Sequence, residues 1–520
     1  MMKQLFARKS LKVLLEDMKG DNRLKRVLGP VTLTALGVGA IIGAGIFVST
    51  GKAANNTAGP ALMISYVIAG ITCIFAALCY AEFASMAPVA GSAYTYAYTT
   101  MGELFAWIIG WDLVLEYAVG SATVANGWSG YFQAVLAKVN IYFPKWLSAP
   151  PWRFHEATNT FELTGSIVNL PAVLIVIIVT AVLIKGISES ATFNAIMVGV
   201  KVGAVLFVII VGAFYINPAN WTGDFAPYGY GGFSLFGIPE LTLGETQGGR
   251  PVGMLAGAAI IFFAYIGFDS VSTHAEEARA PQRDVPIGII ASLLICTVLY
   301  VAVVAVLTGM VPYKQIDVDA GVSSAFKNAG LHWAEVIIAT AGVAGITSVL
   351  LVMMLSGPRV FLAMARDGLV PKKFFADVHP RFRTPWKSTM AIGVFVSVMA
   401  GLLPIDALLE LANIGTLFAF VIVCGAVLIM RKTDPTAERP FRCPFVPAVP
   451  IAGIALCLML MLSLPEGNWL RLVGWLIIGL CIYFFYGRHH STLGKELRGE
   501  IQHHGLTPPS ILEEGNKPPS

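Results

Sequence analysis

Long runs of apolar residues constrain this chain more than any other feature. Most are roughly twenty residues or somewhat longer, the length of helix that crosses the ~30 Å hydrocarbon core of a bilayer. They fall at 31–54, 60–86, 102–136, 167–185, 192–215, 251–275, 286–310, 333–357, 388–403, 407–430, 446–464 and 469–487. Only 13% of the 520 residues are charged, against about 25% in soluble domains. The sequence therefore predicts an all-α polytopic membrane protein with 12 transmembrane helices.

Lysine and arginine are distributed unequally between the predicted loops. With the N-terminus in the cytoplasm, the spans return the C-terminus to the same side, and 26 of the 35 Lys and Arg residues lie inside. This excess follows the positive-inside rule. We expect a multi-pass protein of the cell membrane with both termini cytoplasmic, a basic segment at 1–30 and a polar tail at 488–520. The outer loops at 138–166 and 216–250 are expected to cap the extracellular side.

Glycines cluster in the first apolar run, with four between Gly37 and Gly45. Each costs about 1 kcal/mol relative to alanine in a helix. One explanation is close helix packing, because Gly39 and Gly43 form a GxxxG motif. The other is an interrupted helix, and the sixth run supports it with Gly267 and Asp269 in mid-span. Interruptions at corresponding positions of two halves predict a transporter substrate site.

An interrupted membrane helix exposes backbone groups that a small ligand can use. The N-terminus of a half-helix carries a partial positive charge and attracts a carboxylate. Carbonyl groups freed at the end of the preceding half-helix accept hydrogen bonds from an ammonium group. Two interruptions that face each other suit a zwitterion, so the predicted substrate is an amino acid whose head group is held by the main chain.

Four stretches of the chain resemble the amino acid–polyamine–organocation superfamily, and within it the bacterial cationic-amino-acid-transporter-like branch. They are Gly37–Phe47, Tyr80–Tyr94, Phe262–Glu277 and Pro358–Pro371. The resemblance implies a LeuT-like fold with a 5+5 inverted repeat. The first five-helix repeat would be 31–215 and the second 251–430, followed by two additional transmembrane helices at 446–487.

The same resemblance places the substrate contacts mainly on the backbone. The carboxylate would meet the N–H groups of Gly43, Ala44 and Gly45, and the amino group would meet the carbonyls of Ile41, Phe263, Ala264 and Ile266. In the eighth span, Ile346 is expected to face the substrate side chain. A large apolar residue there, with no acid in the same stretch, favours small or medium neutral L-amino acids such as alanine.

Ionisable residues within spans are candidates for function. Lys201 lies near the middle of the fifth span, and a buried lysine is a candidate for binding and releasing a proton. In proton-coupled relatives, a lysine here resembles a replacement for bound sodium, close to the unwound part of the first span. The alternative is a structural lysine bonded to carbonyls. Glu116 is the second proton-relay candidate, with Asp112 one turn earlier on the same helical face.

Three further charged residues are candidate gates or caps. Asp269 follows the second interruption and is expected to cap the next half-helix. Glu82, near the inner end of the second span, and Arg359, in the segment 358–371 predicted as a loop, are candidates for cytoplasmic gate ion pairs. The alternative for both residues is a solvated loop charge that only helps to set the orientation of the protein in the membrane.

These observations predict a proton-coupled, sodium-independent amino acid symporter that works by alternating access. Three alternatives remain. The first is a cationic amino acid transporter, which would pair its substrate with Asp112 or Glu116. The others are an amino acid exchanger and a non-transporting amino acid sensor. The spans contain no nucleophile–base pair, metal-ligand cluster or phosphate loop, so neither an enzyme nor a cofactor is expected. The predicted partners are the amino acid, protons and membrane lipid, without nucleic acid or an obligate protein partner.

Overall fold

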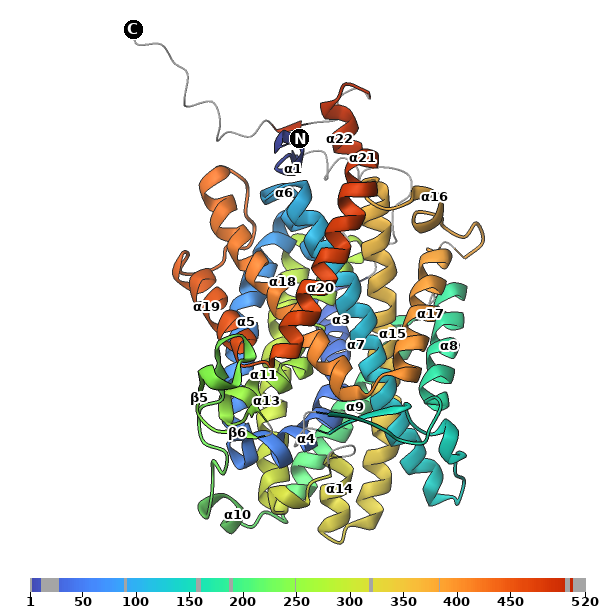
Figure 1. Ribbon diagram of the computed structural model, residues 1–520, viewed down its shortest axis with the longest axis vertical. Coiled ribbons are helices and arrows are strands. Elements are labelled where there is room, and N and C mark those ends of the chain that lie inside the picture. Colours follow the sequence, from blue (N-terminus) through green and yellow to red (C-terminus); the bar gives the residue numbers. More distant parts are fainter. Residues whose placement is uncertain are drawn as a thin grey trace.

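Most of the chain forms one bundle of helices. The computed structural model describes residues 2–10, 28–87, 91–155, 160–186, 190–247, 249–317, 321–382, 384–500 and 506–507. The helices run along the long axis of the molecule, and the two ends of the chain lie at the same end of the bundle (Figure 1). Most of the predicted basic segment 1–30 and the last part of the predicted tail 488–520 fall outside the described residues.

Every predicted apolar run overlaps a helix. Those in one piece are α5 (Leu62–Met86), α7 (Glu103–Lys138), α8 (Leu170–Lys185), α9 (Ser190–Ala213), α13 (Pro281–Met310), α15 (His332–Arg366), α17 (Trp386–Leu402), α18 (Ile405–Thr433), α19 (Ala448–Leu462) and α20 (Glu466–Ile482). The first and sixth runs are interrupted, beginning with α3 (Pro30–Ile41) and α11 (Met254–Ile261). By length and composition, 8 stretches of the described chain are able to cross a membrane, and α8, α17 and α19 are shorter apolar helices.

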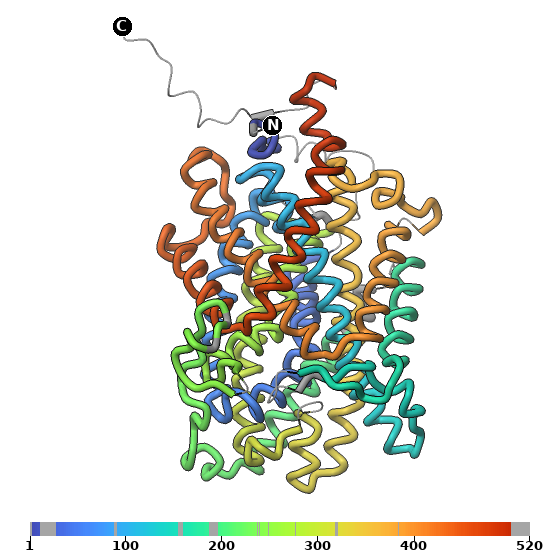
Figure 2. The backbone as a smooth tube through the Cα atoms, viewed as in Figure 1, coloured from blue at the N-terminus to red at the C-terminus, as the bar shows by residue number. Residues whose placement is uncertain are grey.

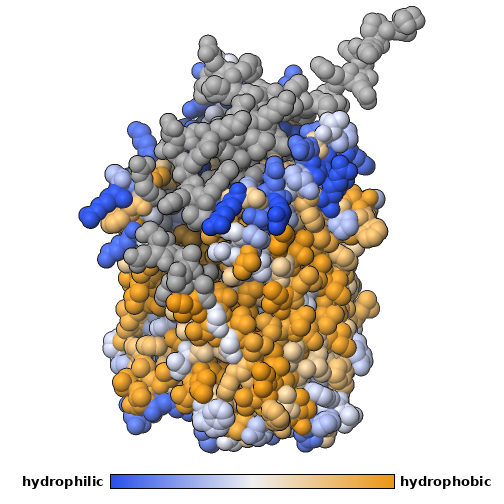
Figure 3. Space-filling view, turned by 180° about the vertical axis from the view of Figure 1, so that it is seen from behind, coloured by the Kyte–Doolittle hydropathy of each residue, from blue (hydrophilic) through white to orange (hydrophobic). Residues whose placement is uncertain are grey.

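The outer surface of the bundle is apolar where a soluble protein would be polar. Val298 of α13, Val394 of α17, and Val473 and Ile477 of α20 are each more than half exposed. Figure 3 shows the result, a broad hydrophobic belt between two ends that carry the polar residues. Contiguous apolar surface of this extent marks contact with a membrane. The chain is therefore a polytopic membrane protein.

The interior is built from α7, which packs against α15 and α18, and from α13, which packs against α3 and α5. Followed from blue to red, the chain places helices from its two halves side by side (Figure 2). The segments predicted as outer loops form short hairpins, β2 (Trp152–His155) with β3 (Thr160–Leu163) and β4 (Phe233–Ser234) with β5 (Thr242–Leu243). These hairpins lie in the half of the molecule away from the two termini (Figure 1).

The structure corrects two expectations about the loops. The segment 358–371 is helical through Arg366, because α15 continues past Pro358. Proline is tolerated within membrane helices where neighbours satisfy the freed backbone groups. The inner segment 87–101 likewise contains a helix, α6 (Ser92–Thr100). Both segments are too polar or too short to read as apolar runs, which is why hydropathy alone missed them.

Candidate functional site

The first span is interrupted at the predicted glycine cluster. Helix α3 ends at Ile41, and Ile42 has extended backbone with ψ of 101°. The chain resumes as a π-helical turn at Gly45–Ser49 and continues into α4 (Thr50–Ala53). The first N–H groups of a helix have no partner within it. The resumed half-helix therefore presents the N–H groups of Gly43, Ala44 and Gly45 at the interruption.

The sixth span is interrupted by a short turn followed by extended backbone. After α11 the chain forms a 3-10 turn over Phe262–Tyr265, and Ile266 is extended. Gly267 has φ of +120°, a conformation that other L-residues rarely adopt. The short helix α12 (Ser270–Thr273) then begins. The interruption thus falls at the glycine from which the sequence predicted it.

The two interruptions touch each other through their backbones. A Cβ atom on Gly45 would collide with the Cα of Ala264, and one on Gly267 would lie 2.9 Å from the carbonyl oxygen of Ala40. Glycine at both positions is what allows this close approach. The candidate contact residues on either side are buried, including Ile41, Ala44, Phe263 and Ile266. The predicted backbone contacts are therefore gathered in one place, in the middle of the bundle.

Two of the predicted carbonyl groups already accept a hydrogen bond. The hydroxyl of Tyr300, on α13, donates to the Ile41 carbonyl at 2.8 Å, and the N–H of Ile266 donates to the Phe263 carbonyl at 3.3 Å. A carbonyl oxygen has two lone pairs, so each retains capacity for a ligand. Sequence reasoning missed Tyr300. The sequence did contain an indication of this contact, because Tyr300 is a tyrosine within an apolar span and a buried hydroxyl needs a hydrogen-bond partner.

Tyr300 belongs to a cluster of aromatic rings beside the first interruption, packed in tilted and edge-to-face geometry. The rings of Tyr66, Tyr265 and Tyr300 have centroids 5.4–6.0 Å apart. Tyr66 hydrogen-bonds to the hydroxyl of Thr50, and Tyr265 donates to the Tyr66 carbonyl. Another buried tyrosine, Tyr131 of α7, donates to the carbonyl of Phe47. Tyrosine hydroxyl groups thus bind two backbone carbonyls of the interrupted first span, those of Ile41 and Phe47.

Lys201 reaches the first interruption from α9. Its side chain is fully buried, and Nζ donates to the carbonyl oxygen of Gly39 at 2.5 Å. The aliphatic part of the side chain lies against Gly345 of α15, where a Cβ would stand 3.2 Å from Cγ. Lys201 therefore contacts the last turn of α3, two residues before that helix ends, whereas the resemblance implied a position against the unwound part of the span.

Two acids on α7 lie deep in the bundle. Asp112 and Glu116 are buried, and within the described chain their carboxylate oxygens have no protein hydrogen-bond partner. Asp112 faces α18, where a Cβ on Gly415 would lie 3.0 Å from its Oδ1. Buried polar groups without a partner are rare and call for an explanation. Reversible protonation is an explanation that suits two carboxyl groups one helical turn apart.

Asp269 stands immediately before α12 but does not bond to the N–H groups of that helix. Its Oδ1 accepts from the N–H of Gly267 at 3.2 Å, and its Oδ2 accepts from the hydroxyl of Tyr117 at 2.5 Å. The carboxylate therefore fixes the turn at the second interruption and ties it to α7. Tyr117 follows Glu116 directly, so this bond brings the second interruption next to the α7 acids.

Ile346 is fully buried in α15. The residue of this helix that meets the first interruption is Val349, because a Cβ on Gly43 would collide with its side chain. Positions three apart lie on the same face of a helix, so Ile346 and Val349 share a face. Sequence reasoning named only Ile346. Trp128 of α7 donates to Thr347 at 2.8 Å and links the two helices nearby.

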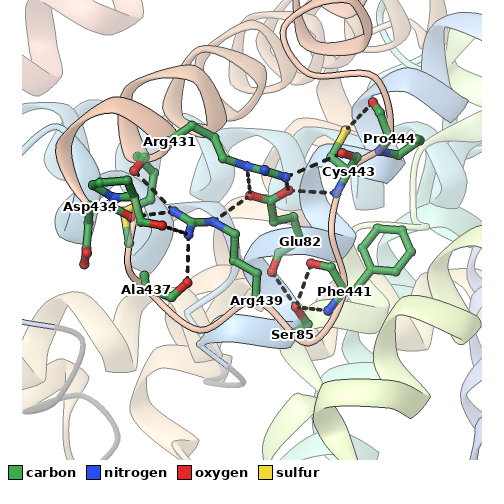
Figure 4. Close-up of polar contacts among 11 residues, drawn as sticks. Glu82, Ser85, Arg431, Asp434, Ala437, Arg439, Phe441, Cys443 and Pro444 are labelled. Carbon is green, nitrogen blue, oxygen red and sulfur yellow. Dashed lines mark hydrogen bonds and ion pairs between the residues drawn. The ribbon is translucent and has the colours of Figure 1, made fainter.

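Glu82 takes part in a buried ion cluster rather than pairing with the segment 358–371. Arg431, near the end of α18, donates to both of its carboxylate oxygens, at 2.9 and 2.6 Å. Arg439 lies 3.3 Å away and the N–H of Cys443 2.7 Å away (Figure 4). The cluster thus clamps the segment between α18 and α19 onto α5.

Arg359 pairs with a different acid. Its guanidinium donates to Glu277 at 2.8 Å, just after the second interruption. Asp367, at the end of α15, accepts from Tyr94 and Lys9. The charged candidates at this end of the bundle therefore form separate ion pairs, and the Arg359–Glu277 pair joins α15 to the interrupted sixth span.

Comparison with known proteins extends these observations. The sequence model of the family described as amino acid permease matches residues 28–486. A branched-chain amino acid permease, BcaP, of Bacillus subtilis (strain 168) is 46% identical over 94% of this chain and 99% of its own. The methylthioribose transporter of the same organism is 43% identical over 95% and 100%. A vacuolar cationic amino acid transporter 4 of Arabidopsis thaliana is 33% identical over 92% and 94%.

Proposed function

Because this chain belongs to the amino acid permease family of the amino acid–polyamine–organocation superfamily, we propose that it is a proton-coupled, sodium-independent symporter of neutral amino acids. It works by alternating access in the cell membrane, with the end that carries both termini in the cytoplasm. Two inverted five-helix repeats and two further helices make up its twelve spans.

The observation that carries this proposal is the meeting of the two interruptions at Gly45 and Ala264. N–H groups at the start of one half-helix and carbonyl groups at the end of another converge there. This arrangement complements a carboxylate and an ammonium group on one carbon atom. The head group of an amino acid is bound by the N–H groups of 43–45 and by carbonyls of Ile41, Phe263, Ala264 and Ile266.

Proton coupling rests on Lys201 and Glu116. Lys201 binds the carbonyl of Gly39 when it carries its proton, and its release would free the last turn of α3 to move. Glu116 lies beside the bond between Tyr117 and Asp269, so its protonation state acts on the second interruption. Protonation of Lys201 thus acts on the first interrupted span, and protonation of Glu116 acts on the second.

The proposed contacts constrain the side chain of the substrate less than its head group. Ile346 and Val349 offer an apolar wall, which supports alanine or a slightly larger neutral residue. Similarity to a branched-chain permease supports the same class, whereas similarity to cationic amino acid transporters supports the alternative, a substrate paired with Asp112 or Glu116. Uptake of labelled alanine, with arginine, leucine and alanine as competitors, decides between them. Competition by arginine as strong as that by alanine would overturn the neutral assignment.

A second candidate substrate comes from the methylthioribose transporter. Methylthioribose has neither a carboxylate nor an ammonium group and would not use the backbone contacts proposed above. Thermal unfolding of the purified protein, screened against the amino acids and methylthioribose, separates the two classes. Stabilisation by methylthioribose and by no amino acid would overturn the amino acid assignment, and stabilisation without uptake would indicate a sensor.

A further inference from the structure

A groove of about 540 Å³ opens on the side of the bundle, away from the two interruptions. One wall is the first half of α13, which contributes Pro286, Ile287, Ile290 and Leu294. The other wall is formed by Pro440 and Phe441, in the segment that joins α18 to α19. Apart from its end at the start of α13, the lining is apolar.

This groove lies on a surface that faces hydrocarbon. Ile287, Leu294 and Val298 are 40%, 47% and 69% exposed along α13, and their spacings of seven and four residues place them on one helical face. Figure 3 shows that most of the described surface in the middle of the face it draws is apolar. A ligand that fills the groove therefore enters from the bilayer, and the part of it that contacts Ile290 and Leu294 is a hydrocarbon chain.

The outer wall of the groove is held in place from behind. Phe441 exchanges hydrogen bonds with the hydroxyl of Ser85, at 3.2 Å through its N–H and 3.4 Å through its carbonyl. Arg439 is buried and donates to four backbone carbonyls of the same segment and the end of α18. Glu82 binds Arg439 and the N–H of Cys443 (Figure 4). The groove is thus preformed, which lowers the entropy lost on binding.

The polar end of the groove carries positive charge. Arg283, in the first turn of α13, lines it, and its side chain is 77% exposed. The carboxylate of Asp284 is 4.0 Å away and also accepts from the N–H of Ala280, so the guanidinium keeps most of its donors available. Arg279, two residues before α13, and Arg442, next to Phe441, are exposed as well. Clusters of arginine at the edge of an apolar surface bind lipid phosphates.

From the groove, its preformed wall and this charge, we propose that the protein binds one anionic phospholipid here. An acyl chain lies between α13 and the segment at Pro440–Phe441, and the phosphate is bound by Arg283 with the amide of Gln282 beside it. The occupant is a membrane lipid with a net negative headgroup, because the apolar length of the groove selects an acyl chain and the arginines select an anion.

Native mass spectrometry of the detergent-purified protein, with added phosphatidylglycerol or phosphatidylcholine of the same acyl chains, tests the proposal. We expect one phosphatidylglycerol to bind several-fold more tightly than phosphatidylcholine. Arg283→Gln should weaken phosphatidylglycerol binding about fivefold, and Arg283→Lys should retain most of it. Ala291 of α13 also lines the groove, and Ala291→Phe, which fills it, should remove the binding of both lipids at this site.

Two matched variants control for charge and for added bulk. Lys373→Gln removes an exposed cation on α16 (Lys372–Phe375), and Val298→Phe adds the same ring to α13 outside the groove; neither should change lipid binding. Equal affinity for the two lipids in the unaltered protein would overturn the proposal. So would an equal loss in Arg283→Gln and Lys373→Gln. If Ala291→Phe impairs folding, the comparison of Arg283→Gln with Arg283→Lys still decides the result.

Discussion

The Nζ atom of Lys201 lies 2.5 Å from the carbonyl oxygen of Gly39, so a side chain of α9 is bonded to the last turn of α3 before the helix breaks. The lysine is fully buried and its stem packs on Gly345 of α15. The side chain of Lys201 therefore joins three helices at the edge of the candidate substrate site. Its release would alter the first interruption directly.

Lys201→Ala should abolish accumulation driven by a pH gradient, because the group that we propose to couple a proton to α3 is removed. In proteoliposomes with an acidic exterior, the internal concentration of labelled substrate should no longer exceed the external one. Exchange at equal concentrations should persist, since the backbone contacts remain. Lys185→Ala, at the exposed end of α8, is the control and should accumulate substrate normally. Full gradient-driven accumulation by Lys201→Ala would refute the role assigned to this lysine.

Gly45→Ala should disrupt the contact between the two interrupted helices. The added methyl group collides with the backbone of Ala264, which cannot move aside as a flexible side chain does. Overpacking of this kind costs about 1–3 kcal/mol, and uptake should be lost because the half-helices no longer meet. Thermal unfolding and uptake measure the two effects. Gly474→Ala, in α20 with open space around it, should be neutral or stabilising.

Glu82→Gln should destabilise the end of the bundle that carries the termini. The variant leaves Arg439 buried without its carboxylate, and removing one partner of a buried ion pair typically costs about 3–5 kcal/mol. We expect a value near the lower limit, because the amide still accepts one hydrogen bond. Lys432→Gln changes an exposed charge on the same helix, α18, and should shift stability by less than about 0.5 kcal/mol. Equal melting temperatures for the two variants would contradict this account.

At the opposite end, α18 is bonded to both interrupted spans. Arg250, four residues before α11, pairs with Glu410 at 2.6 Å, and Lys52 of α4 pairs with Asp406. Arg250→Glu and Glu410→Arg should each lower thermal stability and uptake. The combined charge swap should recover part of both, with a coupling energy of about 0.5–3 kcal/mol. Additive losses would show that this ion pair does not hold α18 to the sixth span.

Much of the architecture was readable from local sequence. Hydropathy predicted the helical runs because each span must satisfy its own backbone hydrogen bonds in lipid and so needs an uninterrupted apolar stretch. The positions of both interruptions were also predictable, since Gly43 and Gly267 stand where a helix former would be expected. By contrast, the helical continuation of α15 past Pro358 was missed, because packing against neighbours outweighs the intrinsic preference of proline.

The sequence by itself determined that this chain enters a membrane, where its helices run and where two of them break. Only the tertiary structure decided which groups meet. No local pattern shows that Lys201 reaches Gly39, that Glu82 pairs with Arg431 and Arg439 instead of the segment 358–371, or that Val349 is the residue against Gly43. Each of these contacts joins residues far apart in the chain, and their distances depend on how the helices pack, which hydropathy and propensity do not encode.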